Sequence, residues 1–599
     1  MTKYSQIIIA TCTLLLGLSA AGQGTLPTSV KEQIEQVENN LAGRIIINGK
    51  PYNILDRMAF YKVKGLSIAV VENYKIVWAK GYGWADENEK RPVTTTTLFK
   101  PGSISKSLNA VGVLKLSDTK KLDIYSDINN YLRSWKFPYD SLAKGKKITT
   151  ANLLSHTGGL SVYGGFPGYD RKSMIPTLPQ VLDGAPPANT PAVRSLFEPG
   201  FQFQYSGGGT IISQLLITDI THQLYEKYMS SSVLKPLGML NSFYSTNPPT
   251  TELLSKIAKG YTIDGEETQA TYRVYPEQAP LGLWTNPTEL GKFMIEAQKA
   301  FNGKATKVIN PKMAQLLLTP YIDNSATMGA FIGERNGGEK YFFHDAGNEG
   351  YRGLYYGSVK GGNGIVAFVN SDDGNILIEL LTSVATVYNW KGFDKPLSVN
   401  TINVPESITN KYPGVYLYEG KLAEVIKDKD GLTYWADNQT SKMYFTSEKD
   451  FINIEFPSAK SFIVDAEGNV KGYKRSLNGN ELPEASKVVA VDTIKTNEGQ
   501  LTAFGWHLLE SKRYNEAIQY LNRGRELEPT VNSIISSTAH CYLFKNEYAK
   551  AITLYKEFIS RNPNDPASQK NSLKEELSYF RKKGFDKEVM EKVIAELNL

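Results

Sequence analysis

The sequence predicts an α+β domain followed by a small antiparallel β-barrel and an α-helical repeat tail. Three observations support this order. β-rich runs bracket helical patterns in the first two thirds of the chain, short strands with tight turns follow, and a sequence repeat occupies the end. The length of 599 residues is about four times the commonest domain length, which argues against a single core.

Composition excludes several classes of protein. Lys and Arg number 67 against 61 Asp and Glu, and the resulting net charge of +6 is spread along the chain. A dedicated nucleic-acid binder would gather its basic residues, so the charge pattern argues against one. Hydrophobic residues make up 41% of the chain and aromatic residues 11%, which excludes wholesale disorder.

Residues 1–21 are typical of a secretory signal peptide. An apolar run from Ile7 to Gly17 is followed by small residues that a signal peptidase favours. A lipoprotein would use Cys12, but most of the apolar run follows that residue, which disfavours this alternative. No later apolar run is long enough to cross a membrane. We therefore expect a secreted or periplasmic protein with no transmembrane segment in the mature chain.

The first predicted domain, residues 25–395, begins and ends with strands. Residues 64–83 hold two β-rich runs around a polar Glu72-Asn73 turn, which predicts a hairpin. Helical patterns follow at 109–116 and 211–228, and 364–370 returns to a short apolar strand. We expect an antiparallel sheet that distant segments complete, covered by a helical cluster.

The second predicted domain, residues 399–491, is a small antiparallel β-barrel. It contains short strands at close spacing, separated by Asp-Gly, Gly-Asn and Asn-Gly turns, at residues 412–416, 432–435, 451–454 and 461–464.

The last predicted domain, residues 495–599, repeats with a period of 34 residues. The residues that recur are Tyr514, Ala517, Ile518 and Pro529, with counterparts at Tyr548, Ala551, Ile552 and Pro563. This spacing resembles the tetratricopeptide repeat, in which small residues let paired helices approach closely. Such repeats often hold a protein partner, and the alternative is that they pack on the barrel and bind nothing.

Ser103 and Lys106 are candidates for acyl-transfer chemistry, which needs a nucleophile and a base. If the Pro-Gly turn before Ser103 opens a helix, residues three apart lie on one face, so the lysine reaches the hydroxyl. The helix N-terminus and partial burial both favour the neutral amine, which is the form that accepts a proton. The same spacing occurs elsewhere, at Ser117/Lys120, Ser141/Lys144 and Ser232/Lys235, so spacing alone does not identify the site.

Three downstream segments distinguish Ser103 from the other serines. Phe99–Lys106, Leu153–Leu160, Glu198–Gly209 and His344–Tyr351, in this order, resemble the serine β-lactamase and penicillin-binding-protein-like hydrolases. The similar branch holds class C β-lactamases, D-Ala-D-Ala carboxypeptidases, D-aminopeptidases and esterases. The resemblance covers residues 63–370 and implies the β-lactamase/transpeptidase-like fold.

The resemblance implies a role for each matching residue. Ser103 corresponds to the acylated nucleophile, Lys106 to its partner and Tyr205 to the tyrosine that shuttles a proton to the leaving group. His344 occupies the position of the lysine in the Lys-Thr-Gly strand of β-lactamases. The backbone N–H groups of Ser103 and Gly347 would form the oxyanion hole.

Two departures from the family pattern fall in the expected substrate-binding set, which is Gly207, Asp345, Ala346 and Asn348. The family's Tyr-x-Asn motif ends here in Gly207, which removes an amide. Either another group supplies this contact, for which Asn348 is a candidate, or the substrate differs from that of β-lactamases. Ala346 stands where the edge strand usually has glycine, and its methyl group would narrow the cleft.

Other chemistry is not expected. His156 is interpreted as a structural residue, because its neighbours form a Thr-Gly-Gly turn. The histidines show no spacing that would cluster zinc ligands, and the run Gly207–Gly209 lacks the Lys-Ser/Thr ending of a phosphate-binding loop. We therefore expect neither a metal nor a cofactor.

The sequence thus predicts an exported serine hydrolase that cleaves amide or ester bonds through an acyl-enzyme. The substrate stays open among D-amino-acid-containing peptides, β-lactams and small esters. The alternative is a penicillin-binding or sensing protein with little turnover, whose helical repeats bind a protein partner.

Overall fold

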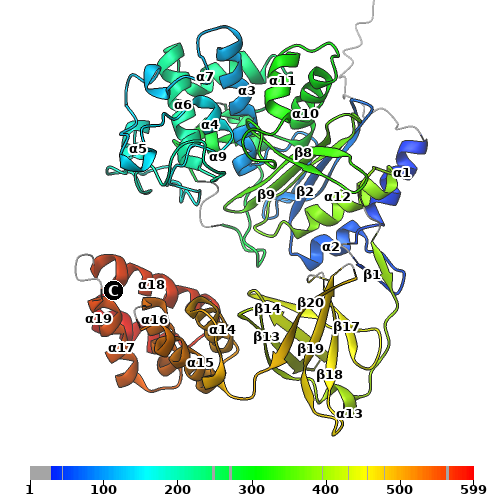
Figure 1. Cartoon of the computed structure of the whole chain (residues 1–599), viewed down its shortest axis with the longest axis vertical. Coiled ribbons are helices and arrows are strands. Elements are labelled where there is room, and N and C mark those ends of the chain that lie inside the picture. The colour runs from blue at the N-terminus through cyan, green and yellow to red at the C-terminus, as the bar shows by residue number, and fades with distance from the viewer. Residues whose placement is uncertain are drawn as a thin grey trace, which may run out of the picture. The chain divides into compact units, whose positions relative to one another are not determined.

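A computed structural model shows two compact units (Figure 1). It describes residues 28–42, 45–245, 250–268, 273–393, 396–429, 431–454, 456, 458–477, 479–529, 531–561 and 566–599. The first unit comprises residues 1–42 and 51–395, and the second comprises 43–50 and 396–599. The expected signal peptide at 1–21 and the expected repeat residue Pro563 lie outside the described residues.

Seven strands form one antiparallel sheet within the described part of the first unit, in the order β4-β3-β2-β10-β9-β8-β7. Their bounds are β2 Gly65–Glu72, β3 Lys75–Asp86, β4 Arg91–Pro92, β7 Phe331–Glu334, β8 Lys340–Asn348, β9 Tyr351–Ser358 and β10 Gly364–Val369. The hairpin of β2 and β3 turns at Asn73 and Tyr74, which both adopt the left-handed region that a tight turn requires.

Segments far apart in the sequence complete this sheet, as expected. β10 pairs with β2, so that Val366 lies opposite Ala69, and on its other side β10 pairs with β9. Every residue of β10 is buried because helices cover both faces of the sheet. The predicted fold class, an antiparallel sheet with a helical cluster, is confirmed.

One face of the sheet packs against α1 (Thr28–Glu38) and α12 (Asn375–Val387), and the other against α3 (Ser105–Asp118) and α10 (Pro287–Phe301). The remaining elements of this unit are α2 Ile54–Phe60, α4 Thr150–Leu154, α5 Leu178–Asp183, α6 Gly207–Thr221, α7 Tyr225–Met229, α8 Thr251–Lys256, α9 Gln278–Leu281, α11 Pro311–Leu318, β5 Phe243–Tyr244 and β6 Leu283–Trp284.

The helical pattern expected over 211–228 is two helices and not one. α6 ends at Thr221 because His222 adopts a left-handed conformation with φ of 55°, and α7 begins at Tyr225. The expectation that His222 lies within a helix is therefore wrong, since it caps the end of α6.

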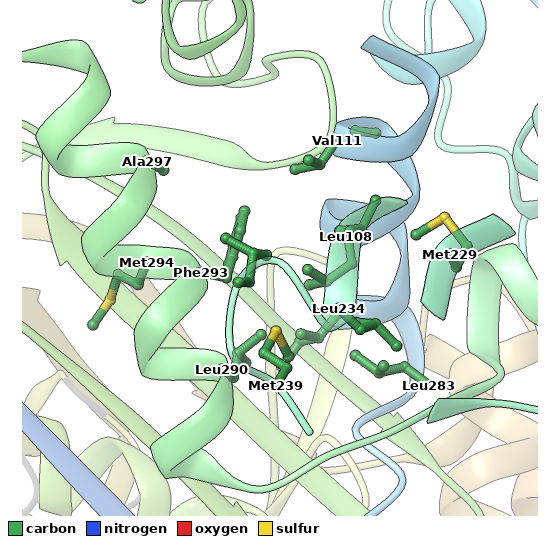
Figure 2. Close-up of a cluster of buried hydrophobic side chains, with 14 of the residues drawn as sticks. Leu108, Val111, Met229, Leu234, Met239, Leu283, Leu290, Phe293, Met294 and Ala297 are labelled. Atoms are coloured by element: carbon green, nitrogen blue, oxygen red, sulfur yellow. The ribbon is translucent and has the colours of Figure 1, made fainter. Parts of the chain in front are cut away.

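Helix α3 runs through the middle of the largest hydrophobic core. Figure 2 shows Leu108 and Val111 of α3 in the same cluster as Phe293 of α10 and Met239. Eleven of the 14 residues of α3 are buried, so the helix is packed on nearly every side. This packing fixes the position of its first turn, which carries Lys106.

The second unit contains nine strands in one sheet within its described residues, in the order β15-β14-β13-β12-β20-β19-β18-β17-β16. Only Met443 separates the two edge strands β15 and β16 in the chain, so the sheet curls until it is nearly closed. The strands are β12 Gly414–Tyr418, β13 Lys421–Asp428, β14 Gly431–Ala436, β15 Gln439–Lys442, β16 Tyr444–Phe445, β17 Asp450–Ile452, β18 Ala459–Val464, β19 Val470–Leu477 and β20 Asn480–Lys487.

Helices follow the barrel in the second unit. They are α14 Glu498–Glu510, α15 Tyr514–Leu527, α16 Asn532–Phe544, α17 Tyr548–Ser560, α18 Pro566–Lys582 and α19 Lys587–Leu597. The repeated alanines, Ala517 and Ala551, are fully buried in α15 and α17. The short pair β1 (Ile45–Ile47) and β11 (Leu397–Val399) is parallel, and α13 spans Glu406–Thr409.

In the part of the chain that the structure describes, no helix combines the length and apolar character needed to cross a membrane.

Candidate active site

Ser103 lies in a short 3-10 turn, Gly102–Ile104, that leads directly into α3. Gly102 has a φ of 58°, and a Cβ atom on it would lie 2.4 Å from the carbonyl oxygen of Gly347. Glycine is therefore required for both its backbone conformation and its close approach to β8. The sequence Pro-Gly-Ser thus holds the candidate nucleophile against the sheet.

Lys106 lies on the first turn of α3 and faces Ser103. Its Nζ is 2.8 Å from the Ser103 Oγ and 3.1 Å from the carbonyl oxygen of Pro280 in α9. Burial lowers the pKa of Lys106 to about 7. A large share of the amine is therefore neutral near pH 7, and the neutral form can accept the serine proton.

Tyr205 lies just before α6 and approaches both residues. Its ring centroid is 5.1 Å from the Lys106 Nζ. Burial raises the pKa of Tyr205 to about 12, although a hydrogen bond with Ser103 acts in the opposite direction. The phenol therefore keeps its proton at neutral pH and can donate it.

The ring of His156 packs on Tyr205, with a centroid distance of 4.2 Å. Its Nδ1 accepts a hydrogen bond of 3.2 Å from the backbone N–H of Ser206, the residue after Tyr205. Phe331 stacks on Tyr205 at 6.3 Å. His156 is thus a positioning residue for Tyr205, which agrees with its structural interpretation.

His344 projects from β8 into the same site. Its Nδ1 is 2.8 Å from the carbonyl oxygen of Asp345. A carbonyl oxygen can only accept, so Nδ1 carries the proton and Nε2 the lone pair. Burial and the nearby Lys106 lower the pKa of His344 to about 3. The imidazole is therefore neutral throughout the physiological range.

Beside Ser103, strand β8 presents an open edge. β7 pairs only with residues 340–343 of β8. On that side, the described residues place no strand against the rest of β8, which holds His344, Asp345 and Gly347. An open edge leaves backbone N–H and C=O groups free to pair with an extended substrate.

A cavity of about 1010 Å³ joins these groups. Seven of the predicted site residues line it, namely Ser103, Lys106, Tyr205, His344, Asp345, Gly347 and Asn348. Neither Gly207 nor Ala346 is among the described residues that line it. Ala346 packs against the hydrophobic core and pairs with Gly353.

Gly207 departs from the family motif because an aromatic ring occupies the adjacent space. A Cβ atom on Gly207 would lie 2.5 Å from Cε2 of Phe166. The Gly207 N–H donates to the carbonyl oxygen of Tyr163 at 2.9 Å. The segment Tyr163–Pro167 therefore fills the place next to Tyr205 where a longer side chain would project.

Asn348 does not take over the missing amide contact in this arrangement. Its Nδ2 donates to the carbonyl oxygen of Leu281 at 3.3 Å. Leu281 follows Pro280 in α9, and the Pro280 carbonyl accepts from Lys106. Asn348 therefore ties β8 to the helix that positions Lys106.

Several residues of the site were not predicted. Phe166 and Phe331 line the cavity, and Pro280 contributes only a backbone carbonyl. Lys100, three residues before Ser103, is buried and donates to the carbonyl oxygen of Arg273 at 2.7 Å. The Gly-Gly pair before Phe166 is a weak signal of a close-packed loop, whereas a backbone carbonyl leaves no signal in the sequence.

The serine, lysine and tyrosine on this fold define a candidate site for acyl transfer at a serine. The family model described as Beta-lactamase matches residues 53–382, which is more than half of the chain. The chain belongs to the Beta-lactamase family. This membership supports hydrolysis of amide or ester bonds.

Two named proteins are similar to this chain in sequence. The chain is 25% identical over 351 residues to "Protein flp" of Staphylococcus aureus (strain N315), a match that covers 56% of this chain and 66% of that protein. The match therefore spans less than two thirds of that relative. "Penicillin-binding protein 4*" of Bacillus subtilis (strain 168) is 23% identical over 438 residues, covering 67% of this chain and 93% of that one.

Among solved structures, the octameric penicillin-binding protein homologue from Pyrococcus abyssi is similar with a TM-score of 0.51 and 20% identity. The similarity covers 72% of this chain and 98% of that one, and it supports the fold alone.

Proposed function

We propose that this protein is an exported serine hydrolase that cleaves an amide or ester bond through an acyl-enzyme at Ser103. The candidate substrates are D-amino-acid-containing peptides, β-lactams and small esters. The observation that carries the proposal is the 2.8 Å distance between the Lys106 Nζ and the Ser103 Oγ within a large cavity. The export part rests on the signal-like residues 1–21.

The reaction begins when neutral Lys106 takes the proton of Ser103. The Ser103 Oγ attacks the carbonyl carbon, and the backbone N–H groups of Ser103 and Gly347 stabilise the oxyanion. Tyr205 donates its proton to the leaving group and takes one back from the Lys106 ammonium, the bond to the leaving group breaks, and the carbonyl re-forms as the acyl-enzyme. Water then attacks this ester and releases the acid, which restores Ser103.

The charge state of the cluster suits these steps. His344 is neutral, because burial lowers its pKa to about 3, so it adds no second positive charge beside Lys106. His344 lines the same cavity, and the lone pair on its Nε2 can orient water or a leaving group. The Pro280 carbonyl holds the lysine in place while the proton moves.

A fluorophosphonate probe tests the proposal, because it reacts covalently with an activated serine. The full mature chain should be labelled, and Ser103→Ala should not. Equal labelling of both proteins, or of neither, would contradict an activated Ser103. N-terminal sequencing of protein recovered outside the cytoplasm tests export, and we expect the chain to begin near residue 22.

A second candidate is a penicillin-binding or sensing protein with little turnover. The observation that favours it is Gly207, packed under Phe166, where the family motif supplies an amide. Acylation of one probe molecule per chain with no measurable release, and capture of a protein partner by the helices α14–α19 of the full chain, would support it over the enzyme.

A further inference from the structure

The carboxylates that line the cavity differ in whether they form an ion pair among the described residues. Three carboxylates line it, from Asp345, Glu349 and Asp372. Glu349 accepts from Arg273 at 3.2 Å, and Asp372 forms an ion pair of 2.9 Å with Arg352. Asp345 has no cationic side chain within ion-pair distance among the described residues. Asp345 is therefore the one of these three carboxylates that forms no ion pair within the described part of the chain.

Asp345 occupies a position from which it can act on a substrate. It lies on the open edge of β8, between His344 and Gly347, and its side chain is exposed. Its carboxylate is close enough to Tyr205 to contribute to the raised pKa of that phenol. An exposed charge on the strand beside Ser103 would lie near any acyl donor bound there.

Among the described residues that line the cavity, the cationic side chains, Lys106 and Arg352, already have partners, since the Lys106 Nζ bonds to the Ser103 Oγ and the Pro280 carbonyl oxygen. His344 is neutral, since its pKa is lowered to about 3 by burial. Arg352 lines the cavity, but its Nη1 already donates to the carbonyl oxygens of Asn348 and Tyr351 and pairs with Asp372. A substrate carboxylate bound along this strand would therefore meet the negative charge of Asp345, and the cations that line the cavity are already engaged elsewhere.

We propose that Asp345 selects acyl donors that carry a cationic ammonium group and disfavours donors that carry a carboxylate. This inference rests on the proposed function, in which Ser103 forms the acyl-enzyme. It favours D-amino-acid amides or esters with a free amino group over β-lactams and over peptides that present a free carboxylate. Two unit charges a few ångströms apart near a protein surface interact strongly enough to change a rate constant about tenfold or more.

Matched esters separate charge from shape. The p-nitrophenyl ester of 4-(trimethylammonio)butanoate carries a fixed positive charge, and that of 5,5-dimethylhexanoate is its neutral isostere. The glutarate monoester supplies a negative charge. Using the full mature chain, with Ser103→Ala as the blank, we expect kcat/KM to fall in the order cationic, neutral, anionic, with about a tenfold ratio between the first two.

Asp345→Asn should lower the cationic-to-neutral ratio of kcat/KM from about ten to about one. The matched control is Glu334→Gln, an exposed carboxylate on the neighbouring strand β7 that does not line the cavity, and it should keep the wild-type ratio. Raising the salt concentration should lower the wild-type ratio, because salt screens exposed charges. That measurement needs no variant, so it tests the proposal even if Asp345→Asn folds poorly.

The outcomes separate this inference from the proposed function. Hydrolysis of all three esters by Ser103→Ala at the wild-type rate would overturn the proposed function. Ser103-dependent hydrolysis with a cationic-to-neutral ratio of one, or a ratio that Asp345→Asn leaves unchanged, would overturn only the role of Asp345. A preference for the anionic ester that Arg352→Gln removes would show that the cavity takes a carboxylate at Arg352 instead.

Discussion

Two buried lysines, one in each unit, have similarly lowered pKa values but different hydrogen-bond partners. Lys106 of the first unit is 4% exposed and Lys460 of β18 in the second is 3% exposed. Burial lowers the pKa of each to about 7. Lys106 has the Ser103 hydroxyl as its partner, whereas the Lys460 Nζ lies 3.1 Å from the Asn453 Oδ1 and 3.0 Å from the Ser458 carbonyl oxygen.

The difference shows that burial creates a neutral amine but does not create a base. Lys460 also lies 4.9 Å from the ring centroid of Tyr434 and lines a cavity of about 290 Å³. The hydrogen bonds described for its Nζ go only to acceptors with no proton to give. Lys106 differs because a hydroxyl, a second proton donor in Tyr205 and room for an acyl donor meet at one place.

The strongest test of this comparison removes each amine in turn. Lys106→Met should lower kcat/KM for a neutral ester by about 10³-fold, because a general base typically supplies a factor of that order. Lys460→Met, the matched control, should stay within about twofold of the wild type, since it lies outside the candidate site. Ester hydrolysis with circular dichroism as a fold check measures both. Similar losses in the two variants would contradict the distinction.

The aromatic neighbour of each lysine gives a second matched pair. Tyr205→Phe should lower kcat/KM by roughly 10²-fold, because it removes the phenol that protonates the leaving group. Tyr434→Phe removes the hydroxyl that bonds to Tyr473 at 3.0 Å and should leave the rate unchanged. The loss for Tyr205→Phe should be larger with amide substrates, whose leaving groups need a proton more than p-nitrophenolate does. An equal loss for both substrate types would argue against proton donation by Tyr205.

Among the groups that take part in the proposed reaction, the Lys106 amine is the one that titrates near pH 7. Because its pKa is lowered to about 7, the neutral base is scarce below pH 7. We expect kcat/KM to rise about tenfold per pH unit up to pH 7 and to level off above it. His344 and Tyr205, with pKa values of about 3 and about 12, contribute no change between pH 5 and 9. A rate that falls as the pH rises through 7 would contradict Lys106 as the base.

The smallest expected effect is on the free energy of unfolding. Both buried lysines should make it depend on pH in the same way. A lysine exposed to water has a pKa of 10.5, and burial lowers the pKa of Lys460 to about 7 in the folded protein. Between these values the unfolded chain holds a proton that the folded chain lacks. The free energy of unfolding should therefore rise with pH, by about 1.4 kcal/mol per pH unit for each lysine.

Lys460→Met removes this dependence from the second unit. The variant should melt above the wild type at pH 7, and the difference should shrink as the pH rises towards 9. Thermal unfolding of the full chain at a series of pH values measures it. A difference that stays constant with pH would mean that Lys460 keeps its proton in the folded protein.

Much of the candidate site was predictable from the sequence because its signals are local or lie in short motifs. The spacing of Ser103 and Lys106 places them on one helical face, and the motifs around Tyr205 and His344 identify their positions. The structure brings all four to one cavity. The break at His222 was not predictable, since apolar residues on both sides continue the helical pattern while one left-handed residue ends it.

The sequence by itself determined the order of strands and helices, the turn at Asn73 and the pairing of Ser103 with Lys106, since these depend on neighbours in the chain. Only the tertiary structure determined the surroundings and the protonation states of the side chains in the site. The Pro280 carbonyl, the Phe166 ring under Gly207 and the unpaired carboxylate of Asp345 come together from segments far apart in the sequence. The pKa of a side chain depends on burial and on every nearby charge, and these are properties of the folded chain.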